Sequence, residues 1–237
     1  MECIAKTDKG VVRSSNQDAF AFGKSADAVW AVVCDGMGGT GGGSIASEIT
    51  VSRFKETAGN MGPSISHSAS NLHTSAITSA NVLVFDKANK DADLKGMGTT
   101  VVSVVVSRGV AYIAHVGDSR AYYIKDGVVS FVTKDHSMVQ SLVESGKITN
   151  DEAKTYKHKN IITRAVGVGE NVDIEFDEID VEEGYILLCT DGLTNMLSEE
   201  KICEIINEDY ATSVDKLIQA ANDRGGNDNI TALVIKL

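Results

Sequence analysis

An apolar run that ends on a carboxylate constrains the fold of this chain more than any other stretch. The seven residues 28–34 are all apolar, and Asp35 and Gly36 follow them directly. A run of this length that is rich in β-branched and aromatic side chains predicts a strand buried on both faces. A carboxylate at the rim of such a core is costly unless a cation lies beside it. Acids at the ends of other strands are therefore the first candidates for a functional site.

Three further acids stand at comparable positions. Asp118 and Asp191 each close a strand-like apolar run, and Asp228 directly precedes the apolar run 230–235. Carboxylate oxygens without clustered histidine or cysteine favour a hard divalent ion such as Mg²⁺ or Mn²⁺ over zinc. We therefore predict a metal centre lined by carboxylates that separate strands contribute.

Length and charge narrow the class of protein. The 237 residues could form one large or two small domains. The chain shows no repeat, low-complexity tract or change of composition that would mark a linker, so we expect a single domain spanning 1–237. The formal charge is −11, with 22 basic against 33 acidic residues. The basic residues form no block, which argues against a nucleic-acid surface.

Cysteine usage and hydropathy point to a cellular compartment. None of the four cysteines belongs to a C-x-x-C pair, and most lie in apolar runs. We expect buried free thiols in a reducing cytosol. No apolar stretch approaches the roughly 20 residues that a membrane helix needs, and residues 1–10 contain no apolar signal segment. The expected location is cytoplasmic, without a membrane partner.

Hydrophobic periodicity predicts a mixed α+β fold. Helical spacing is found in two long segments that could cover a sheet and in two shorter ones near the C-terminus; these are 44–58, 64–90, 198–208 and 212–223. Strand-like runs lie at 2–7, 18–23, 99–107, 110–116, 121–124, 128–132, 161–166, 172–181, 185–190 and 230–235. The runs between 99 and 132 read as one antiparallel meander, with Asp126 and Gly127 as a hairpin turn.

Strands in two clusters and helices in two pairs indicate a four-layer α-β-β-α sandwich, in which two antiparallel sheets are flanked by helices. A polar, helix-like segment at about 137–159 is expected to form a small surface flap. Polar loops on a rigid scaffold often carry recognition, so substrate choice is expected to lie in this flap.

Eight short motifs, in this order, carry a resemblance to a known family. They lie at 13–18, 35–39, 97–100, 117–120, 135–137, 160–167, 190–192 and 226–231. Together they resemble the metal-dependent serine/threonine protein phosphatases of type 2C (the PPM family) in their compact bacterial form. The resemblance implies hydrolysis of phosphoserine and phosphothreonine in proteins by a metal-activated water.

The same resemblance implies a binuclear Mn²⁺ or Mg²⁺ centre. By position, Asp35 would bridge both ions, Asp191 and Asp228 would complete the first, and the carbonyl of Gly36 would serve the second. Asp18 would act mainly through metal-bound water. Two bridged ions suit the chemistry, because they neutralise a phosphate monoester and lower the pKa of a shared water.

Two further roles follow from the resemblance. Bacterial members often hold a third, weaker ion, for which Asp118 with Asp191 is the matching pair. Arg13 would hold the substrate phosphate, since its planar fork can bind two oxygens at once. Phosphorylated proteins, with a cognate serine/threonine kinase as a further partner, are the implied partners, and we expect a monomer.

The chain departs from the eukaryotic pattern beside the predicted metal ligands. Met37 stands where eukaryotic members have a histidine thought to protonate the leaving group, and Thr40 and Ser44 replace the usual histidine and glutamate of the next loop. No general acid is evident among these side chains. We therefore predict that water on a metal protonates the leaving group.

Two other functions remain open from sequence. Residues 36–41 match the G-x-G-x-x-G fingerprint of dinucleotide-binding proteins, although Asp35 stands where the pyrophosphate would approach and no strand-helix-strand units repeat. A catalytically silent binding module with the phosphatase fold is the second alternative, and it would require a lost ligand.

The remaining histidines and arginines are assigned simpler roles. His115 and His136 adjoin motif residues and either support the site or are structural, and the other three histidines are expected at the surface; these are His67, His73 and His158. Arg120 and Arg164 are expected in structural ion pairs.

Overall fold

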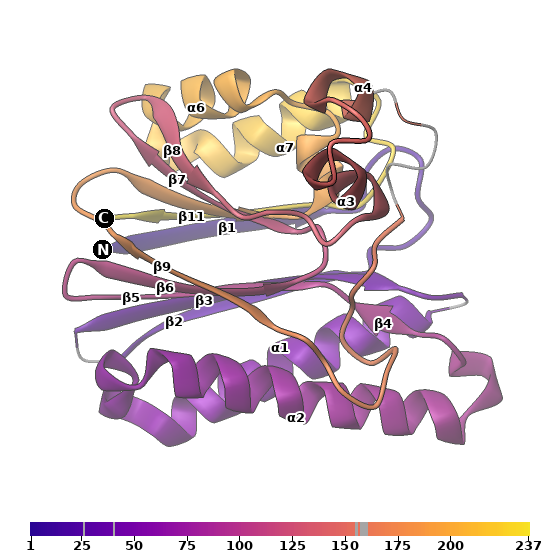
Figure 1. Cartoon of the computed structure of the whole chain (residues 1–237). Coiled ribbons are helices and arrows are strands. Elements are labelled where there is room, and N and C mark those ends of the chain that lie inside the picture. The colour runs from indigo at the N-terminus through magenta and orange to yellow at the C-terminus, as the bar shows by residue number, and fades with distance from the viewer. Residues whose placement is uncertain (26, 40, 155, 157–160) are drawn as a thin grey trace.

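Two antiparallel sheets packed face to face, with helices on both outer surfaces, make up the fold (Figure 1). The computed structural model describes the whole 237-residue chain except residues 26, 40, 155 and 157–160. The predicted α-β-β-α sandwich is thus confirmed, with α1 and α2 below one sheet and α6 and α7 above the other in this view.

The five-stranded sheet has the order β1-β11-β10-β7-β8 and contains both ends of the chain. Its strands are β1 (Glu2–Asp8), β11 (Ile230–Lys236), β10 (Tyr185–Cys189), β7 (Arg120–Lys125) and β8 (Val128–Val132). It is covered by α6 (Glu199–Glu208) and α7 (Ser213–Asp223), while the short α5 (Asp191–Thr194) and η3 (Tyr210–Thr212) connect the neighbouring elements.

The six-stranded sheet has the order β2-β3-β5-β6-β9, with β4 paired to the end of β3. Its strands are β2 (Asp18–Ser25), β3 (Ala28–Met37), β4 (Gly98–Thr99), β5 (Val101–Ser107), β6 (Val110–Val116) and β9 (Glu175–Asp180). It is covered by α1 (Gly42–Met61), η1 (Gly62–His67) and α2 (Ala69–Lys90), and η2 (Ala92–Leu94) packs against α2.

Strand β3 is buried on both faces, as its continuous apolar run predicts. Val29, Ala31 and Val33 belong to the core between the two sheets, where Leu188 and Leu233 also lie. The alternate residues of β3 pack instead against α1 and α2; these are Trp30, Val32 and Cys34. Because side chains alternate across a strand, one short run contributes to two cores and fixes the position of Asp35 at its end.

The predicted meander is wrong in one respect. Its two hairpins belong to different sheets, because β5 pairs with β6 in one sheet and β7 pairs with β8 in the other. The chain changes sheets after Gly117, whose φ of 110° lies in a region that favours glycine. A Cβ at Gly117 would lie 2.6 Å from Thr100 Cγ2. Hairpin signals are local and do not specify which sheet each hairpin joins.

Two other expected elements differ. The helix predicted at 64–90 begins only at Ala69, because Pro63 lies in the separate 3₁₀ segment η1 and Ser68 has a non-helical backbone. The strand predicted at 161–166 is reduced to isolated bridges at Ile162 and Val166. By contrast, Asp126 and Gly127 form the expected turn, with φ of 52° and 81°, as in a type I′ hairpin.

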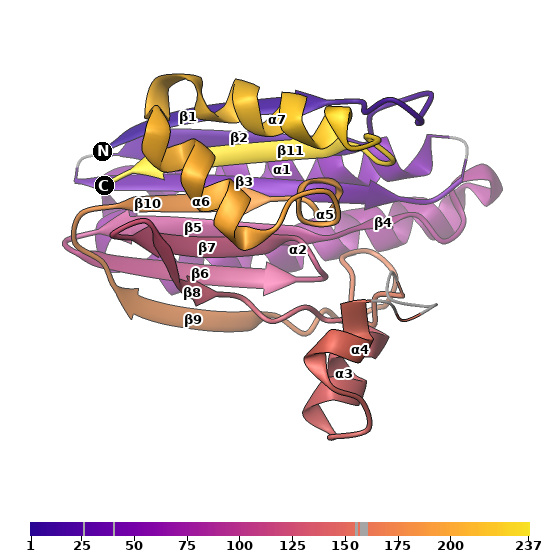
Figure 2. The ribbon, with the colours of Figure 1, turned by 90° about the horizontal axis from the view of Figure 1, so that it is seen from above.

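The expected flap contains two short helices, α3 (Met138–Glu144) and α4 (Asn150–Lys154). Viewed from above, both project beyond the sheets on the side where β9 lies (Figure 2). The end of the segment predicted as flap, at 155 and 157–159, lies outside the described residues.

Candidate metal centre

The predicted acids converge at one end of the sandwich. In the β2–β3 pair, Asp18 lies directly opposite Asp35. Asp191 is the first residue of α5, directly after β10 and Thr190. Asp228 precedes β11, which pairs with β10. Adjacent strand ends from both sheets therefore bring carboxylates from distant parts of the chain to one place.

Electrostatic effects on Asp35 show how close these groups are. Burial raises the pKa of Asp35 well above its ordinary value, and repulsion from four neighbouring carboxylates raises it further; these are Asp18, Asp191, Asp118 and Asp228. Like charges in a low-dielectric region disfavour ionisation. A cluster of this kind is therefore stable at neutral pH only with protons or cations among the carboxylates.

The other acids are affected in the same direction. Burial is the main cause that raises the pKa of Asp18 to about 7 and that of Asp118 to about 7, with repulsion from Asp191 adding to both. Burial, followed by repulsion from Asp228, raises the pKa of Asp191 to about 6. Perturbed carboxylates gathered at one place are typical of functional sites.

Two buried carboxylate oxygens have no partner among the described residues, and they support a cation. Asp18 Oδ2 accepts hydrogen bonds from Thr190 Oγ1 at 2.9 Å and from Thr231 Oγ1 at 2.6 Å, but Asp18 Oδ1 accepts none. Asp191 Oδ2 accepts from Asn195 Nδ2, whereas Asp191 Oδ1 is unpaired. Buried carboxylate oxygens are normally hydrogen-bonded or bound to a metal.

The backbone around Asp35 holds its side chain in place. The Asp35 carbonyl accepts hydrogen bonds from Thr100 N–H and Thr99 Oγ1, and the Asp35 N–H donates to Thr100 Oγ1. Next along the chain, a Cβ at Gly36 would lie 2.1 Å from the carbonyl oxygen of Gly43 in α1. Only glycine allows β3 to approach α1 this closely.

Arg13 lies at the rim of the acid cluster. Its Nη2 donates to Asp228 Oδ2 at 2.7 Å, and its side chain is 53% exposed. The guanidinium therefore has further N–H groups facing solvent beside the carboxylates. This position suits the capture of a phosphate from solution.

Asn229 is a site residue whose role the sequence did not reveal. Its buried side chain accepts from the Gln17 N–H and donates to the carbonyls of Lys9 and Ser15, so it fixes both ends of the loop that carries Arg13. Only its position directly after Asp228 could have suggested this role. A buried amide with several hydrogen bonds to backbone is a strong constraint on a loop.

The expectations for the other charged residues are mostly confirmed. Arg120 forms a bidentate ion pair with Asp135, in which Nε donates to Oδ1 at 2.6 Å and Nη2 donates to Oδ2 at 2.7 Å. Arg164 pairs with Asp173 and Glu175, at 3.2 and 3.6 Å.

The histidines expected at the surface have three different outcomes. His67 is exposed, but the prediction for His73 is wrong, because its ring is fully buried and contacts Ser103 Oγ and the Tyr112 carbonyl. His158 lies outside the described residues.

The cysteines are free thiols, as expected. All four are free, and Cys3 alone is only half-buried.

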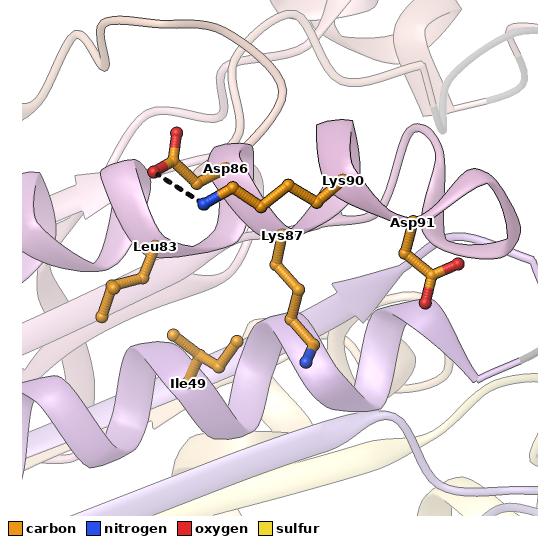
Figure 3. A pocket seen from close by; sticks show the side chains of 6 residues that line it. All are labelled: Ile49, Leu83, Asp86, Lys87, Lys90 and Asp91. Carbon is orange, nitrogen blue, oxygen red and sulfur yellow. Dashed lines mark ion pairs between the residues drawn. The ribbon is translucent and has the colours of Figure 1, made fainter.

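A surface hollow elsewhere does not coincide with the acid cluster. It has a volume of about 560 Å³ and lies between α1 and α2 (Figure 3). Its lining consists of Ile49, Leu83, Asp86, Lys87, Lys90 and Asp91. Asp86 and Lys90 pair across one turn of α2 at 3.8 Å. None of the predicted site residues lines this hollow.

The sequence profile of protein phosphatase 2C matches residues 10–234. The chain belongs to this family. It is a serine/threonine protein phosphatase, and the observed fold is that of its relatives. The dinucleotide alternative fails, because β3 pairs antiparallel with β2, β4 and β5 around the glycine-rich segment.

Individual relatives are similar over essentially the whole chain. The serine/threonine phosphatase stp of Listeria monocytogenes is 35% identical over 247 aligned positions, covering 100% of this chain and 96% of that protein. The solved serine/threonine phosphatase of S. agalactiae is 35% identical with a TM-score of 0.90, covering 100% and 99% of the two chains. The catalytic domain of PstP, solved with two manganese ions, is 30% identical with a TM-score of 0.86 and covers 98% and 96%.

The structure also bears on the membrane prediction. Among the described helices, none is both long and apolar enough to cross a membrane.

Proposed function

We propose that Asp35, Gly36, Asp191 and Asp228 hold two divalent cations, Mn²⁺ or Mg²⁺, at the converging strand ends. The unpaired buried carboxylate oxygen of Asp191, inside a cluster of like charges, is the observation that carries this proposal. The donor set contains only oxygen, which suits hard ions. The two manganese ions in PstP support the number of ions.

Asp18 and Asp118 do not bind the two main ions directly in this proposal. Asp18 is already held by two threonine hydroxyls through Oδ2, and its buried, unpaired Oδ1 would contact the ions through water. Asp191 lies close enough to Asp118 to raise its pKa, and the two carboxylates would hold a third, weaker ion.

The reaction is the hydrolysis of phosphoserine and phosphothreonine esters in proteins. Divalent ions held by these carboxylates would neutralise the charge of the phosphate and lower the pKa of a water molecule that serves as the nucleophile. Arg13 binds and orients the phosphate through its exposed N–H groups, while Asp228 and the loop fixed by Asn229 hold Arg13 in place. No covalent role is required of the acids. Met37 provides no proton for the leaving oxygen, so we assign that proton to water.

The wider biological setting is also proposed from sequence and similarity. The chain would act as a single catalytic domain, as a monomer in the cytoplasm, on phosphorylated proteins that include a cognate serine/threonine kinase. The similarity to full-length bacterial serine/threonine phosphatases supports this setting. Its net charge of −11 does not favour nucleic acid as a partner.

The test is phosphate release from a phosphothreonine peptide by the full chain in Mn²⁺, in Mg²⁺ and in EDTA. We expect metal-dependent release that Asp191→Asn abolishes and that Asp126→Asn, a change in the distant hairpin turn, leaves intact. Release that persists in EDTA, or that survives Asp191→Asn unchanged, would disprove the metal centre.

A further inference from the structure

A second group of ligand-type side chains lies outside the acid cluster, at the base of the flap. It consists of His115 on β6, His136 in the segment between β8 and α3, and Glu175 on β9. His115 and Glu175 lie directly opposite each other in the β6–β9 pair. One nitrogen or oxygen atom from each of the three residues lies within 4.8 Å of the others. Both histidines are buried, and their ring centroids are 4.5 Å apart.

Hydrogen bonds determine where the ring protons lie. His115 Nε2 is 2.8 Å from the Lys134 carbonyl, which can only accept, so Nε2 carries the proton and Nδ1 carries a lone pair. His115 Nδ1 is buried and has no hydrogen-bond partner among the described residues. His136 Nδ1 accepts from the Gly117 N–H at 3.2 Å, so the proton of His136 is on Nε2 and is donated to Glu175 Oε2 at 3.0 Å.

This arrangement leaves a buried lone pair beside a second imidazole and a carboxylate. A cation can be bound by all three groups, each through a lone pair of nitrogen or oxygen. Two imidazole nitrogens and one carboxylate oxygen, with water in the fourth position, form a typical zinc ligand set. We propose that His115 Nδ1, His136 Nε2 and Glu175 bind a transition-metal ion of the zinc class, at a site separate from the Mn²⁺ or Mg²⁺ centre. Binding through Nε2 requires the His136 proton to move to Nδ1, so the hydrogen bond from the Gly117 N–H to Nδ1 is lost when the ion binds.

Two further local features must change when the ion binds. Arg164 Nη1 lies 3.3 Å from His136 Nε2 and 3.6 Å from Glu175 Oε2, so its charge must move away. Arg164 is 39% exposed and also pairs with Asp173 at 3.2 Å, which gives the guanidinium an alternative position. The stacked rings are inclined by 24° and must turn further before their lone pairs converge.

The site is connected to both the flap and the acid cluster. The His136 carbonyl accepts from the Thr163 N–H, and Ser137 forms a bridge with Ile162, so the two chain segments at the base of the flap meet here. The His136 N–H donates to the carbonyl of Gly117, the residue before Asp118. An ion on His136 would therefore fix the base of the flap to β6 and β9.

The test uses the full chain saturated with Mn²⁺, dialysed against zinc and analysed by zinc X-ray absorption and metal content. The described residues of the carboxylate centre include no imidazole, so imidazole scattering excludes zinc in that centre, and the variants below distinguish the new site from other histidines such as the exposed His67. We expect one imidazole-bound zinc per chain in the wild type. This outcome is independent of whether the carboxylate centre is assigned correctly.

Two variants keep the local hydrogen bonds while removing ligands. His115→Gln can still donate to the Lys134 carbonyl, and Glu175→Gln can still accept from His136. Each should lose the imidazole-bound zinc, whereas Glu178→Gln, an exposed change on the same strand, should retain it. Zinc in the wild type without imidazole scattering, or imidazole-bound zinc that is equal in all four proteins, would overturn the proposal. A wild-type spectrum without imidazole scattering decides against the proposal even if a variant fails to fold.

Discussion

Metal binding should stabilise this phosphatase by an amount that increases with pH. The perturbation is removal of Mn²⁺ with a chelator, measured from pH 5.5 to 8. Without metal, the folded state retains protons on Asp18 and Asp118, because burial raises the pKa of each to about 7. In the unfolded chain these carboxylates ionise near pH 4. The metal-free fold therefore loses stability between about pH 4 and pH 7, where it binds more protons than the unfolded chain.

The magnitude follows from the number of protons that metal displaces. Each proton contributes about 1.4 kcal/mol per pH unit. Asp18, Asp118, Asp191 and Asp35 all have raised pKa values and interact with one another, so we expect between one and four displaced protons, or about 1.4–5.4 kcal/mol per pH unit below pH 6. The stabilisation by Mn²⁺ at fixed concentration should rise less steeply near pH 8, where Asp18, Asp118 and Asp191 are already ionised in the folded state.

Buried histidines change the stability with pH in the opposite direction, so their contribution has to cancel between the measurements with and without Mn²⁺. Burial lowers the pKa of His73 to about 4 and also lowers that of His136. Neutral buried histidines make the fold more stable as pH rises toward their ordinary pKa near 6.5. His73 makes the same contribution with and without Mn²⁺, provided that the metal stays in the carboxylate centre. The difference between the two unfolding curves therefore isolates the carboxylates.

The assay is urea unfolding at each pH, in Mn²⁺ and in EDTA, for three proteins. Asp118→Asn should reduce the slope with pH of the stabilisation by Mn²⁺. The reduction should be up to about 1.4 kcal/mol per pH unit, which corresponds to one proton. Asp126→Asn, in an exposed turn whose φ of 52° asparagine tolerates, should leave the slope unchanged. A wild-type difference that stays constant from pH 5.5 to 8 would refute the reasoning, because it would mean that metal displaces no carboxylate protons.

Three other changes test separate parts of the site. Asp191→Asn should lower kcat by about 100-fold or more, because it removes a charge from the ion centre and leaves the packing intact, as circular dichroism should confirm. Arg13→Ala should mainly raise KM for a phosphopeptide, by about 10–100-fold, since a charge-assisted hydrogen bond contributes ~1.5–3 kcal/mol; an unchanged KM would contradict phosphate binding by Arg13. Asn229→Ala removes three hydrogen bonds to backbone and should cost about 2–4 kcal/mol in unfolding free energy. Its KM should rise as well, in contrast to that of Asn207→Ala on α6.

The predictable part of this fold is the part that local patterns encode. The run 28–34 specifies β3 because its apolar residues face two cores, and Asp126-Gly127 specifies a hairpin because both residues tolerate positive φ. The sheet to which each hairpin belongs depends on Gly117 and on contacts with Thr100, which no periodicity shows. His73 was misjudged for a related reason. Its burial is compensated by Ser103 and a carbonyl from a distant strand.

The same distinction applies to the site. Acids at strand ends can be recognised from sequence, because a charge after a buried strand is unusual. Their convergence depends on the register that places Asp18 opposite Asp35 and on the pairing of β10 with β11. Asn229 illustrates what remains hidden, since an asparagine beside an acid has no pattern that distinguishes a loop anchor from a surface residue. Its buried amide nevertheless joins the first loop to the last strand, and through that loop the position of Arg13 depends on the C-terminal end of the chain. Phosphate capture and the attachment of the loop after β1 to the start of β11 should therefore weaken together when this anchor is removed.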